Sequence, residues 1–124
     1  MTGTAEEKIV IVATHGAEDA ERATLPFVVA NAALTMDVKA VICMQGNAVT
    51  LAVKGGADAV AAPGFPPLKD LVASYFAQGG ELLLCTPCIK SRNITADMLV
   101  EKASAIAAAR VVTECLESKA VLNY

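Results

Sequence analysis

Two cysteines three residues apart, Cys85 and Cys88, are the residues of this chain whose type and spacing best fit a chemical role. They follow the apolar run Leu82–Leu84, which is typical of a buried parallel strand. Ligands and reactive groups collect where such strands end, at the carboxyl edge of the sheet. A thiol at that edge, near a helix N-terminus and cations, is expected to have a lowered pKa. The pattern therefore predicts a reactive thiolate at Cys85.

Three further side chains are predicted to assist Cys85. Lys90 and Arg92 follow the cysteine pair, and either could stabilise a thiolate or an anionic sulfur species. His15 follows the first predicted strand, so a parallel sheet would place it at the same edge, where it could exchange protons with the thiol. The alternatives are a solvated face for Lys90 and Arg92, and a capping or packing role for His15.

The other cysteines have weaker claims to chemistry. Cys88 could close a disulfide with Cys85 or resolve a mixed disulfide, and the alternative is packing in the first helical turn. Cys43 ends a predicted strand and Cys115 lies on an apolar helix face, so both are expected to pack. A single CxxC is half of a zinc-ribbon signature, and the chain has neither GxGxxG nor GK[ST]. We therefore predict neither a metal site nor a cofactor.

Length and composition limit the class of protein. The 124 residues predict one domain over residues 1–124, and the net charge of -3 without a Lys/Arg cluster argues against nucleic acid. No run approaches the roughly 20 apolar residues of a membrane span, and residues 1–8 do not read as a secretory signal. We therefore expect a cytoplasmic protein. A hydrophobic fraction of 55% with 19% charged residues is high for a monomer and predicts burial between subunits.

Alternating strands and helices predict an α/β fold with a parallel sheet covered on both faces. A helix is expected from Arg22, with Pro26 in its first turn. The segment 57–67 is predicted to be an irregular loop that could shield the site, and 103–107 fits either a strand or a helix. Strands are expected at 8–13, 40–44, 82–85 and 120–123, and further helices at 48–54, 68–76 and 108–118.

Three stretches of the chain together resemble the DsrE/DsrF-like family, also called YchN-like. They are THGAEDAERATLPFVVANAAL after the first strand, the turn with Asn47 and Gly55, and CTPCIKSRNIT at the cysteine pair. On the family pattern Cys85 takes the position of the sulfur-carrying cysteine, and Arg92 matches the arginine downstream. Asn93 stands where many members have glycine, and both residues tolerate left-handed backbone.

The resemblance implies a three-layer α/β sandwich with a mostly parallel five-stranded sheet and flavodoxin-like topology, which assembles as a homotrimer or homohexamer. It also implies relay of sulfane sulfur, as a persulfide on Cys85, between donor and acceptor proteins, as a sulfurtransferase component. Two alternatives stay open. One is a thiol–disulfide redox protein or sensor that uses Cys85 and Cys88, and the other is a non-catalytic oligomeric binding module.

Overall fold

Five parallel strands form one sheet in the order β4-β3-β2-β1-β5. The structure is a computed structural model and describes residues 7–124. The strands are β1 (Lys8–Ala13), β2 (Lys39–Met44), β3 (Leu82–Cys85), β4 (Ala103–Ile106) and β5 (Ala120–Asn123). The helices are α1 (Ala20–Thr35), α2 (Leu68–Ala77), α3 (Thr86–Ser91) and α4 (Ala108–Leu116), with short 3-10 helices η1 (Gly46–Ala52) and η2 (Ala96–Met98).

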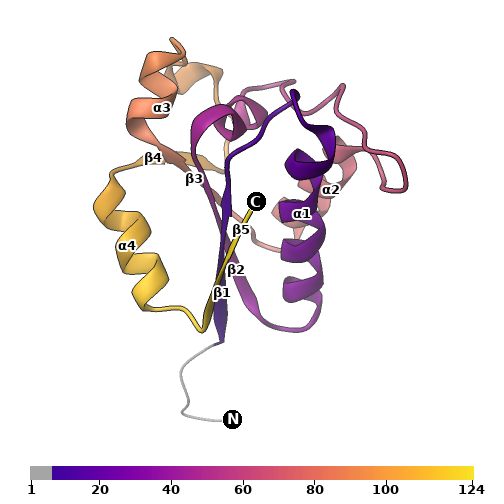
Figure 1. Cartoon of the computed structure of the whole chain (residues 1–124), viewed down its shortest axis with the longest axis vertical. Helices are drawn as coiled ribbons and strands as arrows, with labels where there is room; N and C mark the ends of the chain where they lie inside the picture. The colour runs from indigo at the N-terminus through magenta and orange to yellow at the C-terminus, as the bar shows by residue number, and fades with distance from the viewer. Residues whose placement is uncertain (1–6) are drawn as a thin grey trace.

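The direction of the chain across the sheet decides which face each helix covers. From β1 to β4 each strand is added on the same side of the previous one, and right-handed crossovers then place α1 and α2 on one face. The chain then returns across the whole sheet from β4 to β5, so α4 lies on the opposite face (Figure 1). The result is a three-layer α/β sandwich in which, within residues 7–124, α4 is the helix that forms the second outer layer.

The predicted layered α/β architecture is confirmed, with every strand pair parallel. The strand order is β4-β3-β2-β1-β5, whereas flavodoxin has the order 2-1-3-4-5. The irregular segment 57–67 and the strand at 120–123 are also as expected, and 103–106 is a strand. Asn93 has a φ of 56°, the left-handed conformation that its place in the turn requires.

The start of the first helix was predicted wrongly. The helix begins at Ala20, because the Asp19 side chain caps it by accepting the Arg22 N–H at 3.1 Å. Pro26 therefore lies inside α1, beyond its first turn. The acidic residues before Arg22 belong to the first turn and its cap, where they suit the positive end of the helix.

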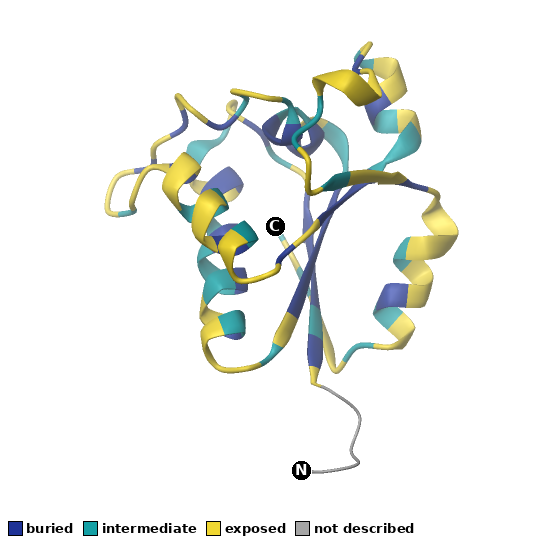
Figure 2. Ribbon diagram, turned by 180° about the vertical axis from the view of Figure 1, so that it is seen from behind, coloured by how far each residue is buried: buried dark blue, intermediate teal, exposed yellow. Residues whose placement is uncertain are grey.

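Two hydrophobic cores lie on the two faces of the sheet. Figure 2 shows the buried central strands between the outer helices. The larger core joins the sheet to α1, α2 and η1 around Phe27 and Tyr75, whose rings pack edge to face with centroids 5.7 Å apart. The smaller core lies under α4 and consists of Val10, Val12, Val41, Cys43, Leu83 and Ile106, with Val111 and Cys115 packed against it.

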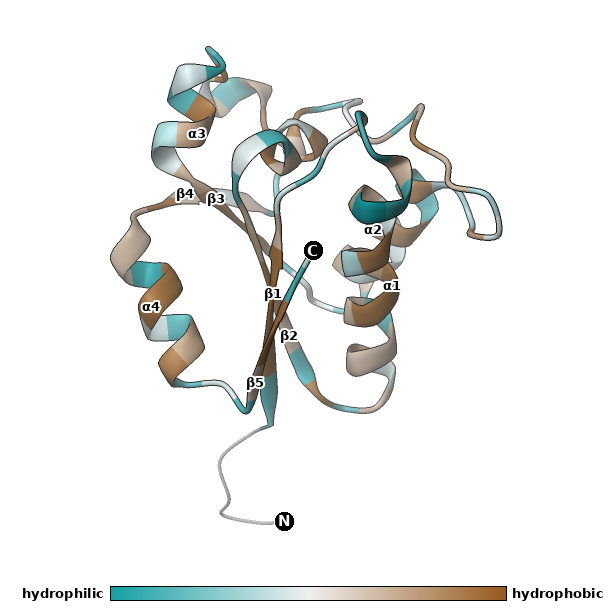
Figure 3. Cartoon of the chain, in the orientation of Figure 1, coloured by the Kyte–Doolittle hydropathy of each residue, from teal (hydrophilic) through white to brown (hydrophobic). Residues whose placement is uncertain are grey.

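Helix α4 covers its face only partly. Figure 3 shows the apolar residues of α4 in brown. Val111 and Cys115 contact the smaller core, whereas Val112 is 57% exposed and Leu116 81% exposed. The predicted single apolar face of this helix thus continues beyond the part that its own sheet can bury.

A buried ion cluster fixes α4 to the beginning of the sheet. Glu114 is buried and accepts hydrogen bonds from Lys8 at 2.9 Å and Arg110 at 2.7 Å. Lys8 is buried too, and it also contacts the exposed Glu117 at 3.3 Å. Burial alone would raise the pKa of Glu114, but Arg110 and Lys8 outweigh burial and lower it.

The lowered pKa of Glu114 predicts acid-sensitive stability. The ionised carboxylate stabilises the fold above its unfolded-state pKa of about 4.5, and the stabilisation is lost as the pH falls through the lower folded-state value. Glu114→Gln should lower the free energy of unfolding at pH 7 by about 3 kcal/mol, because it leaves Lys8 buried with a single weaker partner. Urea denaturation at fixed protein concentration, repeated from pH 7 to below pH 4.5, measures both effects.

Glu117→Gln is the matched control, because it removes a carboxylate of the same cluster that is largely exposed. It should cost less than about 1 kcal/mol. Equal effects of the two variants, or an unchanged acid dependence in Glu114→Gln, would contradict a stabilising role for the buried carboxylate.

Candidate functional site

The cysteine pair stands where β3 gives way to α3. Cys85 is the last residue of β3 and caps α3, and Cys88 lies in the first turn of that helix. The Thr86 hydroxyl donates to the Ile106 carbonyl at the end of β4, at 2.7 Å, which ties the start of α3 to the neighbouring strand. The structure thus confirms the predicted position of the pair at the carboxyl edge of the sheet. Both cysteines are half-buried and neither is in a disulfide.

The end of β2 supplies a hydrogen-bond donor to the sulfur of Cys88. The Gly46 N–H donates to the Cys88 Sγ at 3.3 Å. Gly46 lies two residues after β2 and has a φ of 55°, and a Cβ there would meet the Thr14 carbonyl oxygen at 3.3 Å. A side chain at this position would therefore be both strained and crowded. Because β2 and β3 are neighbours in register, this amide reaches a sulfur 42 residues away.

Arg92 is held beside Cys88 by bonds on both sides of its guanidinium. Its Nη1 donates to the Cys88 carbonyl at 3.1 Å, and its Nε and Nη2 donate to the Asn47 Oδ1 at 3.2 and 2.9 Å. This two-pronged contact fixes the orientation of the planar group. Asn47 was named only as part of the turn after the second predicted strand, so its role toward Arg92 was missed. Its polar side chain just after β2, at the same edge as the cysteines, was the available signal.

His15 belongs to the same surface but not to the cysteine contact. Its Nδ1 lies 2.9 Å from the Glu18 Oε2, and Glu18 also accepts the Gly16 N–H at 2.8 Å. Burial alone would raise the pKa of Glu18, but the Gly16 amide, His15 and Asn47 outweigh it and lower the pKa. His15 therefore pairs with Glu18 rather than with either cysteine.

The surroundings of the two thiols shift their pKa values in opposite directions. For Cys88, partial burial opposes ionisation, but Cys85, the Gly46 amide and the charge of Arg92 outweigh it and lower the pKa. For Cys85, burial and the proximity of Cys88 raise the pKa. The expectation that Cys85 has the lowered pKa is therefore wrong. The thiol that accepts the Gly46 amide is Cys88, and its pKa is the lowered one.

The remaining predicted residues lie apart from the pair. Lys90 is exposed on α3. Cys43 is buried in the smaller core, where burial raises its pKa to about 11, and Cys115 packs against that core. The 57–67 loop packs beside α2, with Ala57 contributing to a small pocket there, and Figure 1 places it on the other side of the molecule from α3. The hypothesis that this loop shields the cysteines is therefore wrong.

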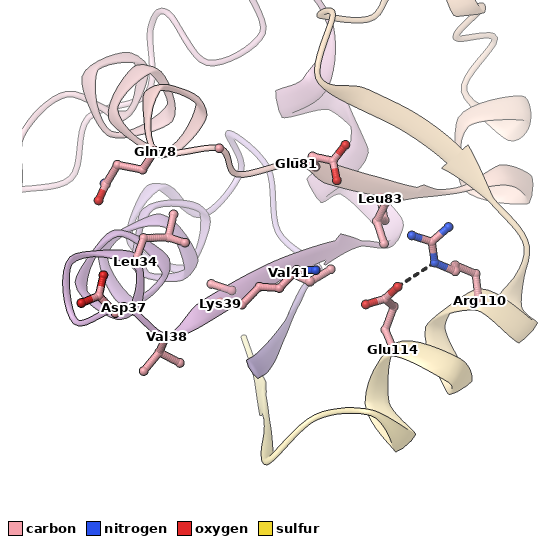
Figure 4. Close-up of a pocket in the computed structure, with 12 residues that line it drawn as sticks. Leu34, Asp37, Val38, Lys39, Val41, Gln78, Glu81, Leu83, Arg110 and Glu114 are labelled. Atoms are coloured by element: carbon pink, nitrogen blue, oxygen red, sulfur yellow. Dashed lines mark hydrogen bonds and ion pairs between the residues drawn. The ribbon is translucent and has the colours of Figure 1, made fainter. Parts of the chain in front are cut away.

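A separate pocket of about 450 Å³ opens at the opposite, amino edge of the sheet. Figure 4 shows Arg110 and Glu114 on one of its walls and Gln78 on another. It is lined by mixed charges and small apolar groups: Leu34, Asp37, Val38, Lys39, Ala40, Val41, Gln78, Gly79, Glu81, Leu83, Arg110 and Glu114. No cysteine lines it, so it is not part of the sulfur site.

Within residues 7–124, no group of three or more His, Cys, Asp or Glu side chains is placed to hold a metal ion. None of the helices in the same range has both the length and the apolar run needed to cross a bilayer.

Comparison with known proteins agrees with this fold. The profile of the DsrE/DsrF-like family matches residues 7–124, and the chain belongs to that family. A curated relative, the uncharacterised protein MJ0760 of Methanocaldococcus jannaschii, is 34% identical over 95 residues, which are 77% of this chain. The match spans only 34% of the relative, about a third of its length.

Solved structures share the fold at low sequence identity. The Escherichia coli ychN protein superposes with a TM-score of 0.73 at 20% identity, covering 95% of this chain and 99% of that one. MTH1491 of Methanobacterium thermoautotrophicum, a protein of unknown function, gives 0.72 at 13% identity, covering 96% and 100%. These likenesses establish the YchN-like architecture and leave the reaction to the site itself.

The charge of Arg92 should set the acidity of the cysteine pair. Arg92→Gln keeps a polar side chain but removes the charge, so the lower apparent pKa of the pair should rise and alkylation at neutral pH should slow roughly three- to tenfold. Lys90→Gln is the matched control and should leave the profile unchanged. The rate of iodoacetamide alkylation from pH 5 to 10 measures both. Equal shifts in the two variants would show a general surface-charge effect and would contradict the role of Arg92.

Proposed function

We propose that this protein takes up sulfane sulfur as a persulfide on Cys85 and passes it to a cysteine of a partner protein. The observation that carries the proposal is the pair of half-buried thiols at the end of β3, with the guanidinium of Arg92 bonded to the Cys88 carbonyl beside them. Membership of the DsrE/DsrF-like family, which is often linked to sulfur relay, supports the same chemistry. The donor and acceptor are proteins of the cytoplasm.

Cys85 is the better placed of the two sulfurs to meet a partner. Cys88 packs against the larger core and accepts the Gly46 amide, whereas Cys85 belongs to neither hydrophobic cluster. Cys88 serves Cys85 by accepting its proton. Although the raised pKa of Cys85 makes its thiolate less populated, that thiolate is the stronger nucleophile once formed, which offsets part of the loss.

Loading is a thiol exchange that balances without a cofactor. The Cys85 sulfur bonds to the outer sulfur of a donor persulfide, R–S–SH, as its proton passes to Cys88. The donor S–S bond breaks, and the R–S⁻ that leaves takes up that proton. Arg92 stabilises the anionic sulfurs during this exchange. Delivery is the reverse exchange, with the thiolate of the acceptor attacking the outer sulfur and Cys85 leaving.

Intact mass after exposure to a persulfide donor tests the assignment. Cys88→Ser should gain the mass of one sulfur atom and retain it. Cys85→Ser should gain it roughly tenfold more slowly, because its remaining site thiol is packed against the core. Cys115→Ser is the control for substitution of a half-buried cysteine. The assignment fails if Cys85→Ser loads as fast as Cys88→Ser.

A thiol–disulfide redox function is the second candidate, favoured by the three-residue spacing of the two free cysteines at the start of α3. The redox function and the carrier function differ in the role of Cys88. In a redox protein Cys88→Ser abolishes activity, whereas in a sulfur carrier the same variant still loads.

We further propose that the chain forms a homo-oligomer, a trimer or hexamer, through the face that α4 covers. A parallel sheet is normally buried on both faces. Here one helix covers five strands, and Val112 and Leu116 on α4 and Val121 on β5 remain exposed. A second copy would bury these side chains and the adjoining pocket.

The position of the exposed apolar residues makes this interface testable. Leu116→Lys places a charge in the proposed interface and should shift the protein toward monomer in sedimentation at micromolar concentration. Met36→Lys is the matched control, because Met36 is 72% exposed but lies at the end of α1, in the opposite layer. A monomeric unmodified protein, or equal dissociation by both variants, would contradict the proposed face.

A further inference from the structure

A persulfide on Cys85 has a second nucleophile within reach. Cys88 lies three residues along the chain from Cys85, in the first turn of α3, and both thiols are half-buried where β3 ends. Residues at this helical spacing have Cβ atoms roughly 5–6 Å apart, so a small approach brings them to disulfide distance. A carrier with a single cysteine has no second nucleophile nearby, so its persulfide persists until a partner protein accepts the sulfur.

We propose, as an extension that rests on the proposed sulfur uptake, that the pair reduces bound sulfane sulfur to hydrosulfide. The Cys88 thiolate attacks the Cys85 Sγ, a Cys85–Cys88 disulfide forms, the bond from Cys85 to the outer sulfur breaks, and HS⁻ leaves with the bonding electron pair. The two cysteines together supply two electrons and the sulfane sulfur receives them. A dithiol reductant must then reopen the disulfide before the next cycle.

Three features of the site favour attack at the inner sulfur. The Gly46 amide donates to the Cys88 sulfur and, with the guanidinium of Arg92, lowers its pKa, which favours the attacking thiolate. Hydrosulfide is a better leaving group than an alkyl thiolate, because hydrogen sulfide is the stronger acid. The raised pKa of Cys85 makes that residue a poor leaving group, which slows transfer of the outer sulfur to Cys88 and, equally, its delivery to an acceptor. Should such transfer occur, attack by Cys85 on the Cys88 persulfide gives the same disulfide and the same hydrosulfide.

The inference places the protein between a source of persulfides and a dithiol reductant. An acceptor protein receives sulfur only if its thiolate reaches the outer sulfur before Cys88 reaches the inner one. Without an acceptor, the reduced pair consumes one persulfide, releases one hydrosulfide and stops as the disulfide. Sulfide release in repeated cycles therefore depends on a dithiol.

A single-turnover experiment separates this inference from the proposed function. The reduced protein, freed of reductant under anaerobic conditions, receives one equivalent of cysteine persulfide. Released sulfide is measured with time, and the protein is analysed by intact mass after alkylation. The unmodified protein should release about one equivalent of sulfide and become resistant to alkylation at both cysteines. Cys88→Ser should retain the added sulfur and release sulfide at least roughly tenfold more slowly, because the adjacent nucleophile is absent.

Two further samples complete the experiment. Cys115→Ser keeps the pair and should behave as the unmodified protein does. Treatment of the spent protein with dithiothreitol, followed by its removal and a second equivalent of donor, should give a second burst of sulfide.

The outcomes distinguish failure of the proposed reduction from failure of the proposed sulfur uptake. If the unmodified protein and Cys88→Ser both hold the sulfur without releasing sulfide, the carrier function stands and the reduction is overturned. If both release sulfide at the same rate, Cys88 is not the attacking group and the reduction is again overturned. If neither protein gains sulfur or releases sulfide, the sulfur-uptake function fails and the extension fails with it.

Discussion

The pairing of β2 with β3 is the constraint on which the site depends. Met44 and Leu84 are partners in this pair, so the two strands end level with one another. The residues that follow, Gly46 from one strand and Cys88 from the other, therefore meet at 3.3 Å. A one-residue slip in register would turn every side chain of the strand to the other face and would remove this contact. The lowered pKa of Cys88 thus depends on the pairing of β2 with β3 as well as on the position of the cysteine itself.

The return of the chain from β4 to β5 gives the molecule its asymmetry. One face of the sheet receives α1 and α2 and builds the larger core, whereas the other receives α4 alone. The ion cluster at Glu114 holds that single helix in place where apolar contact is limited. Such a cluster orients a helix well because a displaced partner would leave a buried charge unpaired. The outward apolar side chains of α4 remain available for other contacts.

Much of the fold could be predicted from the sequence, because its signals are local. Apolar runs such as Leu82–Leu84 indicate strands directly. Turn glycines such as Gly79, which has a φ of 89°, indicate where helices end. The helix start at Ala20 was missed because proline most often marks a first turn, and here the cap at Asp19 decided the start instead. The buried Glu114 was missed because its burial depends on Lys8, 106 residues away.

The candidate site was predictable in its composition but not in its electrostatics. Strand-end position and spacing identified Cys85, Cys88 and Arg92. Which sulfur ionises depends on which one meets the amide of Gly46, and that contact crosses between strands. The hydrogen bond that Arg92 donates to Asn47 could not be predicted for the same reason, because it joins residues 45 positions apart. Family likeness points to Cys85 as the sulfur-carrying position, and only the geometry shows that its neighbour Cys88 accepts the Gly46 amide.

The different surroundings of the two cysteines also connect two functions that sequence reasoning treats as alternatives. A carrier needs a sulfur that accepts and releases a sulfane atom, and a redox protein needs two sulfurs that can bond to one another. Cys85 belongs to neither hydrophobic cluster, and Cys88, three residues on, has a lowered pKa. A persulfide formed on Cys85 would therefore have the nucleophile that could close the disulfide one helical turn away. In this arrangement the lifetime of the carried sulfur depends on how fast an acceptor arrives relative to Cys88.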